Sequence, residues 1–174
     1  MTRRISHGLA FLLVVLAATA SQVVAQAEPT VVYLVRHAEK SDGGADPALT
    51  AQGLARAAML ADLLVDSGIT HIYSSDFIRT RDTAEPLAGR LGLETLIYDP
   101  RDLVGMAARL RNTPGRHLVS GHSNTTPRLV ELLGGDPHTA IDEPSEYDRL
   151  YIVTLLPGGG ASSVLLRYGE LYGG

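Results

Sequence analysis

The sequence predicts one α/β domain, a three-layer sandwich whose mostly parallel central sheet has helices on both faces and ends in an antiparallel hairpin. Strand-like apolar runs alternate with segments of helical spacing, which is typical of a mostly parallel sheet. The run Val31–Val35 is apolar throughout, as expected for a strand buried on both faces. The length of 174 residues fits one such domain.

Cap and turn residues set the limits of the predicted elements. Thr50 is a candidate N-cap and Gly68 a candidate stop for the first helix. Pro157–Gly160 predicts a hairpin turn, and the segment 134–145, which has no clear period, is expected to be a surface loop or a lid. In chain order, the expected elements are strand 31–35, helix 50–67, strand 69–73, helix 76–90, strand 94–98, helix 102–111, strand 117–120, helix 125–133 and strands 147–156 and 162–168.

The composition excludes several classes of protein. The chain has no cysteine, so it cannot form disulfides, a thiolate nucleophile or a cysteine-bound zinc site. Its formal net charge of -4 argues against a general nucleic-acid-binding protein. The chain also lacks the glycine-rich motifs of P-loop and dinucleotide-binding proteins and the GxSxG motif of serine esterases.

Residues 1–27 have the layout of a secretory signal peptide. Arg3 and Arg4 precede the uncharged run Leu9–Ala20, and Ala25–Ala27 provides a small-x-small cleavage site. The apolar run has about a dozen residues, fewer than the ~20 that span a bilayer. We therefore expect export to the periplasm or the medium and cleavage after Ala27, which leaves residues 28–174 as the folded domain. An uncleaved N-terminal anchor is the alternative.

Arginines and histidines follow the predicted strands at the points where these strands end. Arg36 and His37 follow the first strand, Arg79 lies in the first turn of the helix after the second, and His122 follows the fourth. The carboxyl ends of parallel strands meet at one edge of a sheet, where α/β proteins bind ligands. A local cluster of positive charge in an acidic chain indicates a small anionic ligand.

A phosphoryl group suits this set of side chains. Guanidinium groups match phosphate oxygens in shape and charge, and helix N-termini add N–H donors. A neutral imidazole can act as a nucleophile near neutral pH. No metal or other cofactor is expected, because the protein itself supplies the positive charge. A metal bound by His37 and His122 is the alternative, although the chain lacks the spacing of common metal sites.

Four motifs, in the right order, resemble those of the histidine phosphatase superfamily, the phosphoglycerate mutase-like group. The resemblance covers residues 31 to about 133 and implies the α/β sandwich described above. The matching segments are Arg36-His37-Ala38 for the Arg-His-Gly signature, Asp46–Gly53 for the leucine-threonine helix entry, Ser75–Ala84 for the Ser-x-x-x-Arg-(Ala/Thr)-x-x-Thr-Ala signature, and Val119–His122 for the strand end that carries the second histidine.

The resemblance implies a role for each matching residue. His37 attacks phosphorus and carries it as a phosphohistidine, from which water releases phosphate. Arg36, Arg79 and a protonated His122 hold the phosphoryl oxygens, and Ser123 is expected to contact the substrate. The insertions of the mutases are missing, so the chain is more similar to the short phosphatases of the family.

The motifs leave the residue that protonates the leaving oxygen open. One branch of the family uses a glutamate after the Thr-Ala helix, and another uses an aspartate directly after the second histidine, where this chain has Ser123. Asp99, Asp102 and Glu39 are the candidates. Asp99 is preferred because it lies at a predicted strand end.

Other basic residues have simpler explanations. Arg81 competes with Arg79, but residues two apart on a helix point about 200° apart, and the motif spacing favours Arg79. His71, His117 and His138 fall on no motif and are expected to be structural.

The sequence therefore predicts an exported, cofactor-independent phosphatase that hydrolyses small phosphomonoesters through a phosphohistidine on His37. The alternatives are a narrow phosphatase for phosphohistidine proteins or envelope sugar phosphates, a catalytically weak phosphate-binding protein that lacks an effective acid, and a metal-dependent hydrolase. Neither a nucleic-acid partner nor stable membrane insertion of the mature chain is expected.

Overall fold

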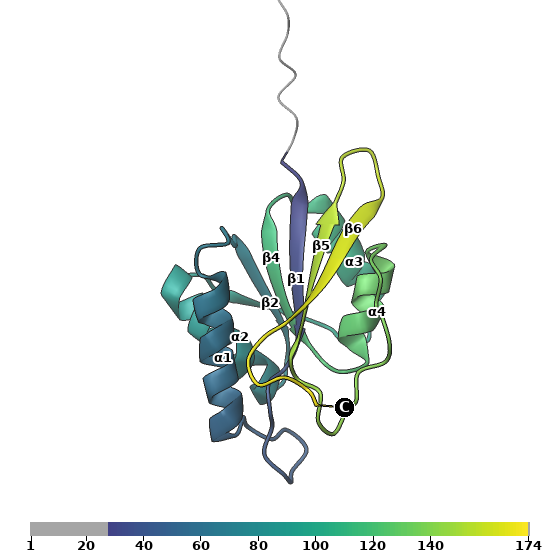
Figure 1. Cartoon of the computed structure of the whole chain (residues 1–174). Coiled ribbons are helices and arrows are strands. Elements are labelled where there is room, and N and C mark those ends of the chain that lie inside the picture. Colours follow the sequence, from purple (N-terminus) through teal and green to yellow (C-terminus); the bar gives the residue numbers. More distant parts are fainter. Residues whose placement is uncertain (1–27, 174) are drawn as a thin grey trace, which may run out of the picture.

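Residues 28–173, which a computed structural model describes, form a six-stranded sheet with two helices on each face (Figure 1). In chain order, the elements are β1 (Thr30–Arg36), α1 (Ala51–Leu64), β2 (His71–Ser75), α2 (Ile78–Leu91), β3 (Thr95–Tyr98), α3 (Leu103–Asn112), β4 (Arg116–Gly121), α4 (Thr125–Leu132), β5 (Arg149–Leu155) and β6 (Ala161–Arg167). The strand order is β3-β2-β4-β1-β5-β6. The first four strands are parallel to one another, β5 is antiparallel to β1, and β6 is antiparallel to β5. The predicted fold class is confirmed.

The central strand β1 explains the three layers, because successive residues of a strand face opposite sides of the sheet. Val31, Tyr33 and Val35 belong to one apolar core, together with residues of α1 and α2. Val32 and Leu34 belong to a second core, together with residues of α3 and α4. An apolar strand without alternation is therefore covered by helices on both of its faces.

The element limits lie within three residues of the predicted ones. The Thr50 hydroxyl accepts a hydrogen bond from the Gly53 N–H (3.0 Å), as an N-cap should. The first helix ends at Leu64, three residues earlier than expected, although Gly68 does adopt the left-handed conformation (φ 71°). Strand β5 begins at Arg149 rather than at Tyr147, whose ring instead lies against Arg36.

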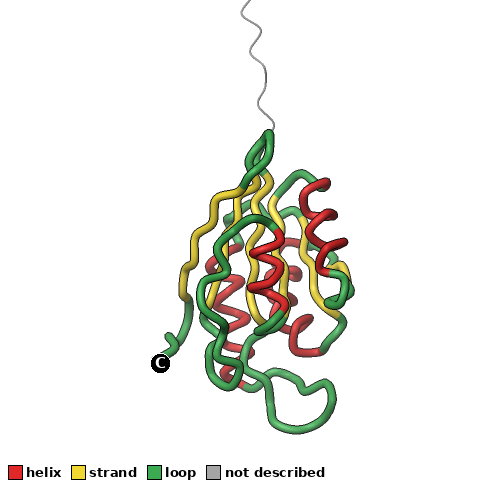
Figure 2. Tube along the Cα trace, turned by 90° about the vertical axis from the view of Figure 1, so that its right-hand side faces the viewer, coloured by secondary structure: helices red, strands yellow, loops and turns green. Residues whose placement is uncertain are grey.

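The loops after β1 and before β5 gather with the C-terminus at one end of the sheet, which is the lower end in Figures 1 and 2. This end is formed by the carboxyl ends of β1, β2 and β4, so it is where the fold predicts a ligand site. Within residues 28–173, no helix is long and apolar enough to cross a bilayer. The expected signal peptide, residues 1–27, lies outside the described residues, so its cleavage stays a prediction.

Candidate active site

The sheet brings the sequence-predicted histidines and Arg79 to one cavity. Strand β4 lies between β1 and β2, with Arg36 opposite Gly121. At the ends of these strands is a cavity of about 380 Å³, and His37, Arg79 and His122 line it. Its other lining residues are Lys40, Phe77, Pro100, Arg101, Ser123, Asn124, Thr125 and Glu143.

His37 is buried, and a backbone hydrogen bond fixes its ring. Its Nδ1 lies 2.8 Å from the carbonyl oxygen of Ala38, and because a carbonyl only accepts, Nδ1 carries the proton. The lone pair of the neutral ring is then on Nε2. Burial and the positive charge of Arg36 lower the pKa of His37 from 6.5 to about 3. His37 is therefore a neutral imidazole at neutral pH, which is the protonation state of a nucleophile.

His122 lies edge-on to His37, with 5.5 Å between the ring centroids. Its Nε2 is 2.9 Å from Ser75 Oγ. Burial and the positive charge of Arg79 lower the pKa of His122 to about 4. The sequence interpretation had His122 protonated, whereas by this pKa it is neutral at neutral pH when no anion is bound. A phosphoryl dianion beside it would favour the protonated form, since an opposite charge stabilises the cation.

Uncharged residues of the Ser75–Ala84 motif hold both histidines in place. Ser75 contacts His122, as described above. The Thr83 hydroxyl, from α2, accepts the Ala38 N–H at 2.9 Å and so fixes the backbone that follows His37. Serine and threonine at these two motif positions therefore position the imidazoles.

Arg79 is positioned by Asp46, which lies in the loop before α1. Asp46 Oδ1 is 3.4 Å from Arg79 Nη1, and the same oxygen accepts the Ile78 N–H at the start of α2 (2.9 Å). The Nε of Arg79 is buried and has no hydrogen-bond partner among the described residues. Arg81 instead pairs with the exposed Asp76. The geometry thus agrees with the choice of Arg79 over Arg81.

Arg36 is placed differently from what the resemblance implied. Its side chain is buried and does not line the cavity. Its Nη1 donates to the carbonyl oxygen of Glu146 (2.9 Å) and its Nη2 to that of Glu143 (2.6 Å), so it fastens the loop before β5. The Tyr147 ring lies 4.0 Å from its guanidinium carbon. The Nε of Arg36 is buried and has no hydrogen-bond partner among the described residues. It is therefore the atom of Arg36 that could still donate to a phosphoryl oxygen, and this contact stays a prediction.

The three expected acids are not among the residues that line the His37 cavity. Asp99 is exposed and held by Arg101 through two 2.9 Å contacts, which lower the pKa of its carboxyl group. Asp102 caps α3 by accepting the Gly105 N–H. Glu39 accepts two hydrogen bonds from the buried Arg56.

Glu143 is the one carboxylate among the residues that line the cavity. It lies in the loop 134–145, which the sequence left as a surface loop or a lid. Its Oε1 is 3.3 Å from Arg36 Nη2, and its side chain is 59% exposed, so it can exchange protons with water. Ser123, expected to contact the substrate, also lines the cavity.

The remaining histidines lie elsewhere. His71 and His117 stack at 5.0 Å near the amino ends of β2 and β4, the opposite end of the sheet from the cavity. His138 is exposed in the loop after α4. Among residues 28–173, no three potential metal ligands are grouped closely enough to hold an ion.

Comparison with known proteins identifies this arrangement. A family model of the histidine phosphatase superfamily (branch 1) matches residues 32–101, the segment that carries His37 and Arg79. Over these 70 of its 174 residues, the chain is similar to the histidine phosphatase superfamily. A Yersinia pestis (strain Pestoides F) protein named probable phosphoglycerate mutase GpmB is 43% identical over 77 residues. That match covers 40% of this chain and 35% of the relative, so the chain spans about a third of the length of such relatives.

Two solved phosphatase structures share the fold of this chain. The protein histidine phosphatase SixA, complexed with tungstate, is 20% identical and superposes with a TM-score of 0.63 over 79% of this chain and 96% of its own. A mycobacterial glucosyl-3-phosphoglycerate phosphatase is 17% identical, with a TM-score of 0.58 over 81% of this chain and 99% of its own. At these identities the likeness shows the fold alone.

Proposed function

We propose that the protein is an exported phosphatase that hydrolyses phosphomonoesters through a phosphohistidine on His37. The observation that carries the proposal is the state of His37, a buried neutral imidazole with its proton fixed on Nδ1. The buried Nε–H groups of Arg36 and Arg79, which have no partner among the described residues, are donors for an anion. A nucleophile beside unpaired cationic donors is what phosphoryl transfer requires.

The first half of the reaction makes the phosphoenzyme. Nε2 of His37 attacks phosphorus, and the bond between phosphorus and the leaving oxygen breaks. Arg79 and, once protonated, His122 stabilise the charge on the phosphoryl oxygens. Glu143 gives its proton to the leaving oxygen, because it is the carboxyl group that lines the cavity.

The second half of the reaction releases phosphate. A water molecule attacks the phosphorus of the phosphohistidine, and the bond from Nε2 to phosphorus breaks. The carboxylate of Glu143 takes the proton of the attacking water, which restores the acid for the next turnover. The exposure of Glu143 fits contact with both water and the leaving group.

Hydrolysis is favoured over a mutase reaction. The chain lacks the mutase-type insertions, so little protein covers the cavity to exclude water from the phosphoenzyme. A phosphohistidine protein is a second candidate substrate, because SixA, which shares this fold, is named as a protein histidine phosphatase.

The decisive experiment is hydrolysis of p-nitrophenyl phosphate by residues 28–174 in the presence of EDTA. We expect turnover, its loss in His37→Ala, and an acid-labile phosphoenzyme in the wild type only. His138→Ala, an exposed histidine outside the cavity, is the control and should behave as wild type. Turnover by His37→Ala, or its loss on chelation, would overturn the mechanism. Phosphate transfer to 3-phosphoglycerate in place of water would indicate a mutase.

Export is tested separately. Expression of the full chain in a bacterium should give a periplasmic or secreted product whose first residue is Glu28. A product that keeps residues 1–27 and sediments with membranes would support the uncleaved anchor instead.

A further inference from the structure

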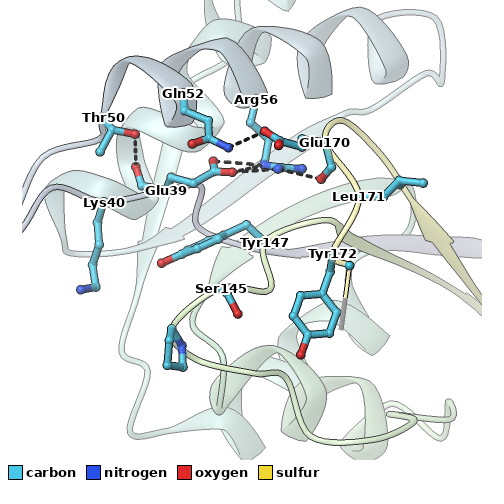
Figure 3. A pocket seen from close by; sticks show the side chains of 12 residues that line it. Glu39, Lys40, Thr50, Gln52, Arg56, Ser145, Tyr147, Glu170, Leu171 and Tyr172 are labelled. Carbon is cyan, nitrogen blue, oxygen red and sulfur yellow. Dashed lines mark hydrogen bonds and ion pairs between the residues drawn. The ribbon is translucent and has the colours of Figure 1, made fainter.

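A second cavity, of about 580 Å³, borders the active site (Figure 3). It lies between the start of α1, the loop before β5 and the C-terminal segment 170–173. Figure 3 shows the Tyr147 ring across its middle, with Glu39 and Arg56 on one side and Tyr172 on the other. None of the residues that act in the proposed reaction lines this cavity.

Two residues join the second cavity to the first. Lys40 lines both. Tyr147 lines the second cavity, and its ring centroid lies 6.0 Å from that of His37. A phosphomonoester whose phosphorus is attacked by His37 can therefore extend its leaving group past Lys40 and Tyr147 into the second cavity.

The walls of the second cavity are held firmly in place. Arg56, 5% exposed, donates to both carboxylate oxygens of Glu39 and to the carbonyl oxygens of Tyr168 (2.7 Å) and Glu170 (2.9 Å). These bonds fasten the C-terminal segment to α1. The Tyr172 N–H donates to Asp148 (2.9 Å), which fixes the other end of the segment. A preformed cavity loses little conformational entropy when a ligand binds.

The lining chemistry matches an uncharged, hydroxyl-rich ligand. Two acids, Glu39 and Glu170, face two bases, Lys40 and Arg56, so the wall carries no net charge. Pro144, Leu171 and Gly173 add apolar surface to the lining. The remaining lining residues carry amide or hydroxyl groups that can both donate and accept hydrogen bonds, and two of them are tyrosines with flat rings. They are Gln52, Thr50, Ser145, Tyr147 and Tyr172. Gln52 donates to Glu170, and Ser145 and Tyr172 donate to Asp142, but an amide or hydroxyl group with one such bond can still make another. A polyol can use these remaining donors and acceptors, whereas an alkyl chain cannot.

We infer that the second cavity binds the leaving group of the substrate and that this group is a sugar or sugar alcohol. The inference rests on the proposed phosphatase activity and adds the class of substrate to it. Specificity then depends on residues of α1 and of the C-terminal segment, which lie outside the motifs that bind the phosphoryl group.

The test compares two substrates with the same carbon chain, hexitol 6-phosphate and n-hexyl phosphate. Both release a primary alcohol, so they differ only in the hydroxyl groups that the second cavity would bind. We expect wild-type kcat/KM to be at least tenfold higher for hexitol 6-phosphate. The double variant Gln52→Ala/Tyr172→Phe should lower this ratio about tenfold, since it removes two hydrogen-bonding groups. Glu94→Ala, an exposed residue outside the cavities, should leave the ratio as in wild type.

Binding to His37→Ala, measured by calorimetry, separates this inference from the proposed reaction. If the variant prefers hexitol 6-phosphate over n-hexyl phosphate, the cavity is supported even if no turnover occurs. Equal binding and equal kcat/KM for the two esters would overturn the inference while leaving the phosphatase proposal in place. A third outcome is that the double variant loses activity toward a phosphohistidine peptide while its ratio of kcat/KM for the two esters stays unchanged. That result would overturn the sugar inference in favour of a protein substrate.

Discussion

Asp46 and Arg79 form an ion pair that ties the loop before α1 to the active site. The Asp46 carboxylate lies 3.4 Å from Arg79 Nη1 and also accepts the N–H of Ile78, the first residue of α2. An anion at a helix N-terminus interacts favourably with the helix dipole. One carboxylate thus fixes both the start of the helix and the side chain that the helix presents to the cavity.

Asp46→Asn should therefore lower kcat/KM for p-nitrophenyl phosphate about tenfold, because a neutral amide holds the guanidinium less firmly. The fold should persist, as the pair is partly exposed and such pairs contribute little to stability. Asp76→Asn is the matched control, since it removes the partner of Arg81 at the same helix start. Equal losses in the two variants would show that the effect is on the helix and not on Arg79.

A direct comparison of Arg79→Ala with Arg81→Ala tests which arginine binds the phosphoryl group. Loss of a charge-assisted contact in the transition state costs about 1.5–3 kcal/mol, so Arg79→Ala should lose roughly 10- to 150-fold in kcat/KM. Arg81→Ala should stay within about threefold of wild type, because exposed ion pairs are worth ~0–1 kcal/mol. The reverse order of effects would show that the motif spacing assigns the wrong arginine.

Much of the fold and half of the site follow from local sequence patterns. The apolar run of β1, the cap at Thr50 and the glycine turns are local signals, so the strand and helix order could be predicted. The histidines and Arg79 converge because parallel strands end at one edge, which is a rule of topology. The loop contacts of Arg36 could not be predicted, because its partners are carbonyl groups more than 100 residues away in the chain.

Glu143, the carboxylate that lines the His37 cavity, was not among the candidate acids of the sequence, for a similar reason. Asp99 lies at a strand end, as expected, but Arg101 holds its carboxylate outside the His37 cavity. Glu143 lies in a segment without periodic signal, and only the folded loop brings it to the cavity.

The two active-site histidines should titrate far below ordinary imidazoles. Burial and nearby arginines lower the pKa of His37 to about 3 and that of His122 to about 4. In an NMR titration of the imidazole nitrogens, both rings should remain neutral from pH 7 to pH 5. Addition of vanadate at pH 7 should raise the pKa of His122. A midpoint near 6.5 for His37 would show that burial and Arg36 do not control its protonation.

Glu143→Gln should slow the hydrolysis of an ester most when its leaving oxygen must be protonated by an acid. The p-nitrophenolate group leaves without protonation, so its kcat should fall only through the slower second step. An alkyl phosphate must have its leaving oxygen protonated, and its kcat should fall about 100-fold, the usual size of general acid catalysis. Asp99→Asn is the control, as the preferred acid of the sequence interpretation. A larger loss in Asp99→Asn than in Glu143→Gln would return the role to Asp99.

The buried His117 predicts a loss of stability in mild acid. Its ring is buried, its Nε2 donates to the Thr113 carbonyl (2.9 Å), and its Nδ1 has no partner among the described residues. Burial lowers the pKa of His117 in the folded state, so below pH 6.5 the unfolded chain binds the proton more readily than the folded one. The free energy of unfolding is thus highest above pH 6.5 and falls as the pH drops toward the folded pKa. Urea unfolding of His117→Gln should show a smaller decrease between pH 7 and pH 5 than wild type shows. His138→Asn, at an exposed left-handed position that asparagine tolerates, should keep the full decrease. An unchanged decrease in His117→Gln would assign the acid sensitivity to the active-site histidines.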